Sequence, residues 1–201
     1  MSAATFAREF LRNRQNIGAV VPSSPALAEC IVEAARVQCA SYVLELGPGT
    51  GPFTASIEQA MKADARYLGV EMNPAFVETL RHRFPRLDFA EAAAQYYDFG
   101  QWLPQDTGFD SIVCGLPWAA FPEQLQLDIL HHVLPRLAPG GRFTTFAYAG
   151  FHLMPKGRHF RQVLEAQPGS LSTSPIVWRN FPPAFVYILE RPAATYPSAP
   201  Q

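Results

Sequence analysis

The segment Glu45-Leu46-Gly47-Pro48-Gly49-Thr50-Gly51 places three glycines at alternate positions behind an acidic residue. The apolar run 42–46 predicts a short buried strand before this segment, and Pro52 predicts the first turn of a helix after it. Glycines in such a turn let the backbone approach a ligand closely. A phosphate loop would need Gly-Lys-Ser/Thr, which is absent, and a dinucleotide loop would need glycine where Pro52 stands.

A second acidic residue follows at the end of the next predicted strand. Glu71 ends the run ARYLGVE, twenty residues past Gly51. A carboxylate at the end of the neighbouring strand can accept both ribose hydroxyls of an adenosine. The alternative is a tight turn with an unrelated surface acid, and the combination of strand, loop, helix, strand and acid favours the nucleoside site.

Strand and helix patterns alternate along the chain, which predicts an α/β fold whose parallel sheet is covered on both faces. The expected strands are 42–46, 65–71, 87–91, 109–115, 142–148, 174–179 and 184–190. The expected helices are 24–37, 52–62, 74–84, 95–103, 122–137 and 156–166, the first capped by Ser23 or Ser24. The last two strands flank the short turn NFPP and should form an antiparallel hairpin.

These features resemble the class I S-adenosylmethionine-dependent methyltransferases, whose first motif is (Asp/Glu)-x-Gly-x-Gly-x-Gly. The resemblance implies a Rossmann-like, seven-stranded, mostly parallel sheet with an antiparallel last strand and extra N-terminal helices. It implies S-adenosylmethionine as cofactor and S-adenosylhomocysteine as product. It places Glu45 and the three glycines at the methionine end of the donor and Glu71 at the ribose.

The third strand departs from the family pattern. The family commonly has Gly-Asp-Ala there, with Asp near the adenine amine, whereas this chain has Glu91-Ala92-Ala93. Glu91 or the backbone would have to replace that contact. The residues that the resemblance places at the donor are Gln15, Asn16, Ser23, Glu45, Gly47, Gly49, Gly51, Glu71, Met72, Ala92, Ala93, Gly115 and Leu116.

Further stretches narrow the resemblance to the bacterial phospholipid N-methyltransferases, which convert phosphatidylethanolamine towards phosphatidylcholine. They are FLRNRQNIGAVVPSSPALA, VLELGPGTGPFT, GLPWAAFP, LAPGGRFTTFAY and VWRNFPPAFVY. The related ribosomal RNA adenine dimethylases carry Asn-Leu-Pro-aromatic where this chain has Gly-Leu-Pro-Trp. An adenine amine needs a side-chain acceptor such as Asn, whereas an alkyl amine needs room for its methyl groups, and Gly115 is expected to provide that room.

The substrate side is expected to be aromatic, because aromatic faces favour a substituted ammonium. Trp118 and Tyr148 are expected at the site, whereas Phe121 and Trp178 fit the core equally well. Tyr148 and His152 are the candidate proton acceptors, with water as an alternative. The substrate-binding set is Pro117, Trp118, Tyr148 and Arg179, where Arg179 would contact a phosphate. Asn180 is expected to shape the turn.

Composition indicates one methyltransferase domain over 1–192 and a disordered tail at 193–201. The 201 residues have a formal net charge of −1, no apolar run long enough to span a bilayer, and three cysteines without metal-ligand spacing. No metal and no nucleic acid are therefore expected, and the chain is expected to be a monomer. An RNA adenine or another small-molecule amine remains the alternative substrate.

The N-terminal segment 1–14 predicts an amphipathic helix. Phe6 and Phe10 fall on one side, and Arg8 and Arg12 fall on the other. Such a helix suits an anionic membrane surface, and packing on the protein's own core is an equally strong alternative. With a phospholipid as the partner substrate, the predicted location is the cytoplasm, peripherally attached to the inner face of the membrane.

Overall fold

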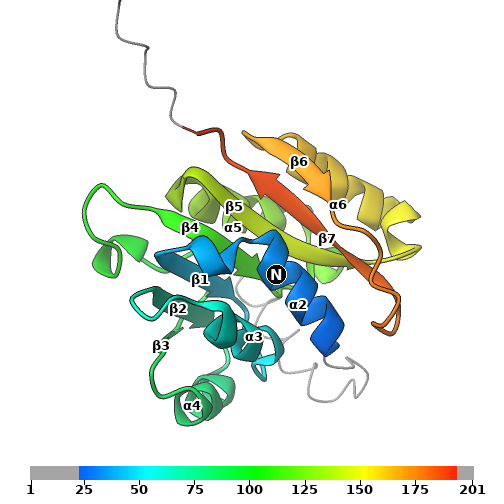
Figure 1. The fold of residues 1–201 in the computed structure, drawn as a ribbon. Helices are drawn as coiled ribbons and strands as arrows, with labels where there is room; N and C mark the ends of the chain where they lie inside the picture. The colour runs from blue at the N-terminus through cyan, green and yellow to red at the C-terminus, as the bar shows by residue number, and fades with distance from the viewer. Residues whose placement is uncertain (1–22, 194–201) are drawn as a thin grey trace, which may run out of the picture.

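A seven-stranded sheet with helices on both faces forms the body of the molecule, seen in a computed structural model that describes residues 23–193 (Figure 1). The strands are β1 (Tyr42–Leu46), β2 (Arg66–Glu71), β3 (Asp88–Glu91), β4 (Phe109–Cys114), β5 (Leu137–Tyr148), β6 (Ser170–Thr173) and β7 (Ala184–Glu190). The helices are α2 (Pro25–Ala34), α3 (Pro52–Ala60), α4 (Pro74–Arg83), α5 (Glu123–Val133) and α6 (Pro155–Glu165). Gln15, Asn16, the segment 1–14 and the tail from 194 onward lie outside the described residues.

The strand order is β3-β2-β1-β4-β5-β7-β6. β1 to β5 are parallel, and β7 runs antiparallel between β5 and β6. This confirms the expected Rossmann-like sheet and the antiparallel pairing of its last two strands, although a loop over 174–183 joins them instead of the short turn NFPP. The chain leaves β1 in one direction along the sheet and β4 in the other, so the switch point lies between the carboxyl ends of these two strands.

Short local signals fix where the helices begin. Proline occupies the first turn of α2, α3, α4 and α6, where its missing N–H costs nothing. Ser24 caps α2 by accepting a hydrogen bond from the Leu27 amide at 3.2 Å, which settles the choice between Ser23 and Ser24. Asn73 caps α4 in the same way through the Ala75 amide.

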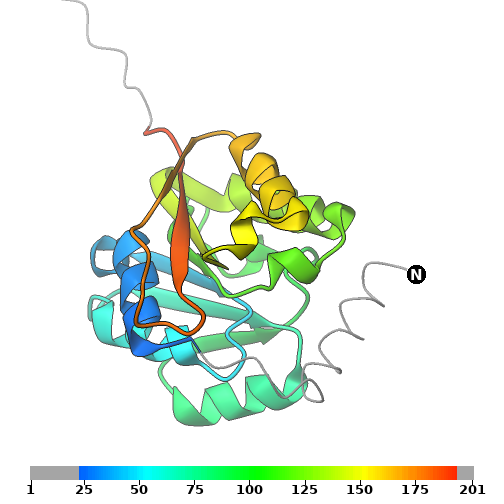
Figure 2. The same cartoon turned by 90° about the vertical axis from the view of Figure 1, so that its right-hand side faces the viewer.

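The two faces of the sheet bury separate apolar clusters. Helices cover both faces (Figure 2). Leu27, Ile57 and Leu80 come from α2, α3 and α4 and pack on one face, whereas Ile129 of α5 and Leu164 of α6 pack on the other.

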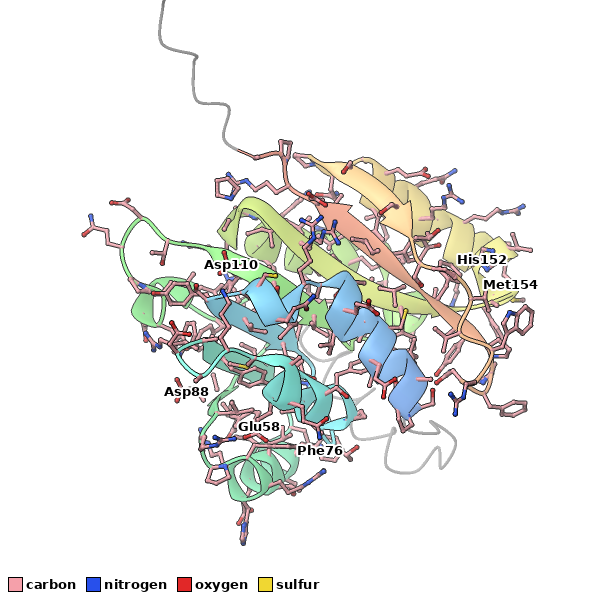
Figure 3. All side chains as sticks on the ribbon, in the orientation of Figure 1. Glu58, Phe76, Asp88, Asp110, His152 and Met154 are labelled. Atoms are coloured by element: carbon pink, nitrogen blue, oxygen red, sulfur yellow. The ribbon has the colours of Figure 1, made fainter. Side chains whose placement is uncertain are left out.

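Polar contacts hold the amino ends of the central strands together. The Asp110 carboxylate, labelled in Figure 3, accepts hydrogen bonds from the Ser41 amide at 2.8 Å and the Tyr42 amide at 3.0 Å. This carboxylate joins the start of β1 to β4, so the two strands that flank the switch point are fixed at both ends.

Three expected elements differ from the structure. β6 lies at Ser170–Thr173 rather than at 174–179, and only a single bridge joins Val177 to Ala184 in the later stretch. Ile176 and Trp178 occupy alternate positions, as apolar residues do in a half-buried strand, but both side chains are exposed. The stretch 95–103 contains one 3₁₀ turn at Phe99–Gln101, and α5 ends at Val133, ahead of Pro135, which has no N–H to continue the helix.

Candidate functional site

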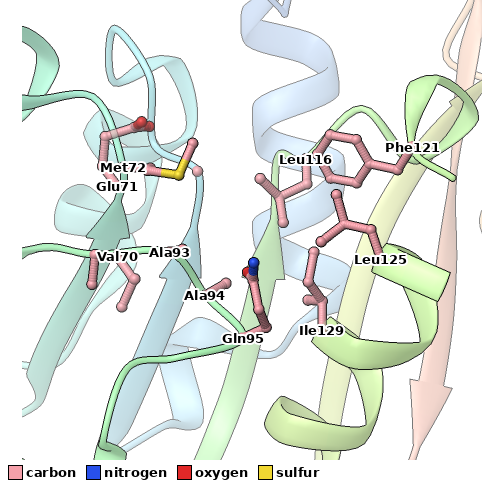
Figure 4. Close-up of a pocket in the computed structure, with 12 residues that line it drawn as sticks. Val70, Glu71, Met72, Ala93, Ala94, Gln95, Leu116, Phe121, Leu125 and Ile129 are labelled. Carbon is pink, nitrogen blue, oxygen red and sulfur yellow. The ribbon is translucent and has the colours of Figure 1, made fainter. Parts of the chain in front are cut away.

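A cleft of about 490 Å³, partly open to solvent, lies at the carboxyl ends of β1, β2 and β4 (Figure 4). Six residues expected at the donor line it: Gly47, Glu71, Met72, Ala92, Ala93 and Leu116. Phe121, for which the sequence left site and core open, also lines it, as do five residues that the sequence did not indicate: Val70, Ala94, Gln95, Leu125 and Ile129.

Of the three glycines of the loop, Gly47 lines the cleft, and all three take backbone conformations that other residues rarely adopt. Gly47, Gly49 and Gly51 have φ values of +67°, +61° and +84°. A Cβ at Gly47 would lie 2.7 Å from Leu116 Cδ2, so glycine allows Leu116 to pack closely there. A Cβ at Gly49 would meet only the Gly47 carbonyl at 4.0 Å, so space beside Gly49 is open to a ligand.

Glu71 reaches the glycine loop from the end of β2. Its side chain is buried, and its two carboxylate oxygens accept hydrogen bonds from the Gly49 amide at 3.0 Å and the Asn73 amide at 2.9 Å. Each oxygen has a second lone pair. The carboxylate can therefore hold the loop and still accept hydroxyl donors from a ligand in the cleft.

Apolar side chains face each other across the cleft. Met72 lies on one side, Leu116 and Phe121 lie on the other, and Gln95 projects between them (Figure 4). Gln95 Nε2 is buried and has no hydrogen-bond partner among the described residues. A narrow apolar slot with one unsatisfied amide donor suits a flat heterocycle that offers an acceptor on its edge.

Comparison with known proteins assigns this chain to a family. A methyltransferase-domain model matches residues 43–141. Over 142 residues, which are 69% of this chain and 73% of the relative, the chain is 37% identical to the ornithine lipid N-methyltransferase of Singulisphaera acidiphila. The chain belongs to the class I S-adenosylmethionine-dependent methyltransferases. Its methyl donor is S-adenosylmethionine.

Other relatives of this methyltransferase differ in substrate. It is 34% identical over 120 residues to the trans-aconitate 2-methyltransferase of Methylobacterium radiotolerans, covering 60% of this chain and 41% of that protein. The O-methyltransferase of Bacillus cereus in complex with SAH has a TM-score of 0.66 at 13% identity, with 94% and 92% of the chains covered. The O-methyltransferase TomG of Streptomyces achromogenes in complex with SAM has a TM-score of 0.64 at 18% sequence identity, with 94% of this chain and 87% of that chain covered. These two structures share the fold.

The first acid of the methyltransferase motif lies behind the cleft. Glu45 is fully buried and is not among the residues that line the cleft. Its Oε2 accepts hydrogen bonds from Thr54 Oγ1 at 2.8 Å and Tyr67 Oη at 2.5 Å, and its Oε1 has no partner among the described residues. Burial raises the pKa of Glu45 to about 7, although both hydrogen bonds lower it.

The structure has no open space where a side chain at position 115 would lie, in place of the glycine hydrogen of Gly115. A Cβ there would lie 3.0 Å from the Gly47 carbonyl and 3.7 Å from Phe53. The Gly115 amide donates to the Leu46 carbonyl at 2.9 Å, so the ends of β1 and β4 approach closely at this point. The expected room for methyl groups is therefore absent on this side, and the glycine serves the close approach instead.

Trp118 is a core residue rather than an exposed aromatic face. Its exposed fraction is 3%, its ring stacks on Phe160 with centroids 4.9 Å apart, and its Nε1 donates to Thr145 Oγ1. Pro117 beside it is half-buried. Phe121 lines the cleft, and Trp178 is 74% exposed, so neither of these two aromatics belongs to the buried core.

The remaining candidates lie near the ends of β5 and β7. Tyr148 is half-buried beside Phe151, with ring centroids 6.3 Å apart. His152 packs edge-on against Phe185, and its Nδ1 accepts from the Gly150 amide at 3.2 Å. That bond leaves the proton on Nε2 in the neutral ring, which favours a structural role for His152.

Arg179 and Asn180 have different surroundings. Arg179 is exposed, whereas Asn180 is buried and shapes its turn as expected. Ser23 is half-buried at the entrance to α2. No group of three His, Cys, Asp or Glu side chains within 23–193 gathers as a metal site would require, and no helix there is long and apolar enough to cross a membrane.

Proposed function

We propose that this methyltransferase transfers methyl groups to the primary amine of a membrane-lipid headgroup. Phosphatidylethanolamine and ornithine lipid are the two candidate substrates, because both present a primary alkyl amine. The identity of 37% to an ornithine lipid N-methyltransferase over most of both chains carries this proposal. Phosphatidylethanolamine enters through the resemblance of Gly115-Leu116-Pro117-Trp118 and its companion segments to the phospholipid enzymes.

The donor fits the residues of the cleft. When bound, it supplies an electrophilic methyl group on a positively charged sulfur. Glu71 would accept the ribose hydroxyls with its free lone pairs, and Gly49 would let the ligand lie against the backbone. Gln95 would donate from its orphan amide to a ring nitrogen on the adenine edge, a different contact from the one that the family's Asp makes with the adenine amine.

Positioning accounts for most of the chemistry that the protein supplies. The substrate nitrogen attacks the methyl carbon as the carbon–sulfur bond breaks, and the thioether leaves without needing a proton. An alkyl ammonium titrates near lysine, at a pKa of about 10, so it must lose its proton first. We propose that Tyr148, the last residue of β5, passes that proton to water.

An alkyl amine suits this site better than a nucleic-acid base does. Gly115 stands where the RNA adenine enzymes place the Asn that orients a flat amine, and a Cβ there would make a close contact of 3.0 Å with the Gly47 carbonyl. The net charge of −1 gives no general attraction for nucleic acid.

A substrate panel tests the proposal. Labelled S-adenosylmethionine is offered with detergent-dispersed phosphatidylethanolamine, detergent-dispersed ornithine lipid, free ethanolamine, free ornithine, trans-aconitate and RNA. We expect label in one or both amine lipids and none in the water-soluble compounds. Label only in trans-aconitate, a free amine or RNA would overturn the lipid proposal, and the two lipid arms identify the headgroup.

A further inference from the structure

Large apolar side chains are exposed at one end of the described molecule. Of seven large hydrophobic residues exposed within 23–193, six lie in two loops, 149–154 after β5 and 174–183 before β7. We call these six the apolar rim: Phe151, Leu153, Met154, Ile176, Trp178 and Phe181. The exposed fractions of Trp178 and Phe181 are 74% and 82%, which is unusual for such side chains in a protein without a partner.

The two loops lie side by side and are held in place. The Ala149 amide of the first loop donates to the Pro183 carbonyl of the second at 2.7 Å. Figure 3 places the labelled His152 and Met154 beside the loop that precedes β7. Asn180 fixes that loop, because its Oδ1 accepts from the Ser24 amide at 2.9 Å and its Nδ2 donates to the Pro182 carbonyl. Buried Asn180 therefore fixes the loop, and Trp178 before it and Phe181 after it are exposed.

The two segments that carry the rim contain charged side chains of one sign. Segments 149–160 and 174–183 contain Lys156, Arg158 and Arg179 and no Asp or Glu. These three bases are exposed, and none forms an ion pair with another residue in the described part of the chain. The one carboxylate that pairs with these segments is Glu123, whose oxygen lies 3.3 Å from His159 Nε2.

We propose that the apolar rim and its three bases dock this methyltransferase on the surface of an anionic lipid bilayer. Tryptophan and phenylalanine suit the boundary between headgroups and acyl chains, and lysine and arginine suit anionic headgroups. The proposal rests on the proposed function insofar as a lipid substrate requires the site to face a membrane. It assigns the contact to two loops of the folded domain, in addition to or in place of the N-terminal segment 1–14.

A separate groove lies beside the start of α6 and shares Phe121 with the donor cleft. It spans about 890 Å³ including the open solvent at its mouth, and residues 119–123, Pro155, Lys156 and His159 line it. Pro155 directly follows Met154 of the rim, and Phe121 lines both the groove and the donor cleft. A headgroup that enters between Lys156 and Phe121 would approach the donor while its acyl chains remain in the bilayer.

Vesicle binding tests the docking surface without any methyl transfer. Vesicles of phosphatidylglycerol and phosphatidylcholine are compared with pure phosphatidylcholine, using the full chain. We expect Trp178→Ser with Phe181→Ser to weaken partitioning about tenfold, and Tyr96→Ser, the exposed aromatic outside the rim, to leave it unchanged. Lys156→Gln and Arg158→Gln should each weaken binding to the anionic vesicles about fivefold, whereas Arg86→Gln should not.

A spectroscopic measurement locates the contact independently. Lipids with brominated acyl chains should quench the fluorescence of Trp178, and Trp178→Phe should remove that quenching while keeping most of the binding. Equal partitioning of the Ser variant and the parent, or binding lost only in Arg8→Glu with Arg12→Glu, would overturn the rim as the docking site. A parent that ignores vesicles but forms a dimer that the Ser variant loses would assign the rim to a second copy of the chain.

The outcomes separate this proposal from the proposed function. A parent that methylates a detergent-dispersed amine lipid but binds no anionic vesicle leaves the function standing and removes the docking surface. A parent that binds anionic vesicles through the rim but methylates no amine lipid leaves the docking surface standing and removes the proposed function.

Discussion

Among single residues, Glu71 has the clearest double role. Its carboxylate accepts hydrogen bonds from the Gly49 and Asn73 amides and is proposed to accept the ribose hydroxyls as well. Its removal would therefore release the glycine loop and delete the ribose contacts together.

Glu71→Ala should weaken S-adenosylmethionine binding by at least about 30-fold, since hydrogen bonds to a charged group contribute about 1.5–3 kcal/mol each. Isothermal calorimetry measures the affinity, and circular dichroism checks the fold. Glu78→Ala is the control, because Glu78 is an exposed carboxylate on α4 that does not line the cleft. Unchanged affinity in Glu71→Ala would contradict the assignment of the cleft.

Glu45 links stability to pH. Its pKa is raised from 4.5 to about 7 by burial, so the native state binds an extra proton between these values and stability falls as the pH rises through this interval. The fall amounts to about 3 kcal/mol at most. Glu45→Gln does not titrate and should lack this component in denaturant unfolding at pH 4.5 to 7.5. Parallel pH profiles for the parent and Glu45→Gln would contradict the raised pKa.

Gln95 is the residue proposed to contact the adenine edge. Gln95→Ala should weaken donor binding about fivefold to tenfold, which is the loss of one neutral hydrogen bond of about 1–1.5 kcal/mol. Gln124→Ala serves as control, because Gln124 is an exposed amide on α5 that pairs only with Asp128. If Gln95→Ala binds the donor and adenosine as tightly as the parent does, the adenine contact lies elsewhere.

Among the structural elements, the loop before β7 depends on Asn180. Asn180→Ala leaves the Ser24 amide without its acceptor and should lower the free energy of unfolding by about 1–3 kcal/mol. Urea denaturation measures this loss. Ser172→Ala, on the exposed surface of β6, is the control and should be neutral. A neutral Asn180→Ala would mean that the loop is held by its backbone bridge alone.

Elements with strong local signals were predictable from the sequence, and the others were not. Prolines and caps place the starts of α2, α3 and α4, and continuous apolar runs place β1, β2 and β4. The strand predicted at 174–179 was wrong because alternation there reflects exposed side chains of the rim, not a buried face. Local pattern does not reveal which side of an alternating segment meets the core.

The donor site was predictable to the extent that it is local in sequence. Gly47, Glu71, Met72 and Leu116 belong to motifs at strand ends, and the topology brings those ends together. Gln95, Leu125 and Ile129 line the cleft through packing between distant segments, which no motif records. Trp118 follows the strand-end motif, but the ring of Phe160, forty-two positions later, draws it into the core.

At the scale of the whole molecule, the functional features share one edge of the sheet. The donor cleft, the groove and the apolar rim all lie beyond the carboxyl ends of the parallel strands, and the rim follows β5 and precedes β7. With the rim against a bilayer, this arrangement would present the groove to headgroups and keep the helices of both faces away from lipid.

The most direct test of the central claim identifies the atom that receives the methyl group. The purified chain is incubated with S-adenosylmethionine and detergent-dispersed phosphatidylethanolamine or ornithine lipid, and the products are analysed by tandem mass spectrometry before and after mild alkali. We predict added methyl groups on the headgroup nitrogen fragment that survive alkali, and none with Glu71→Ala. An alkali-labile methyl ester, or lipid products without any added methyl group, would contradict N-methylation of a lipid amine.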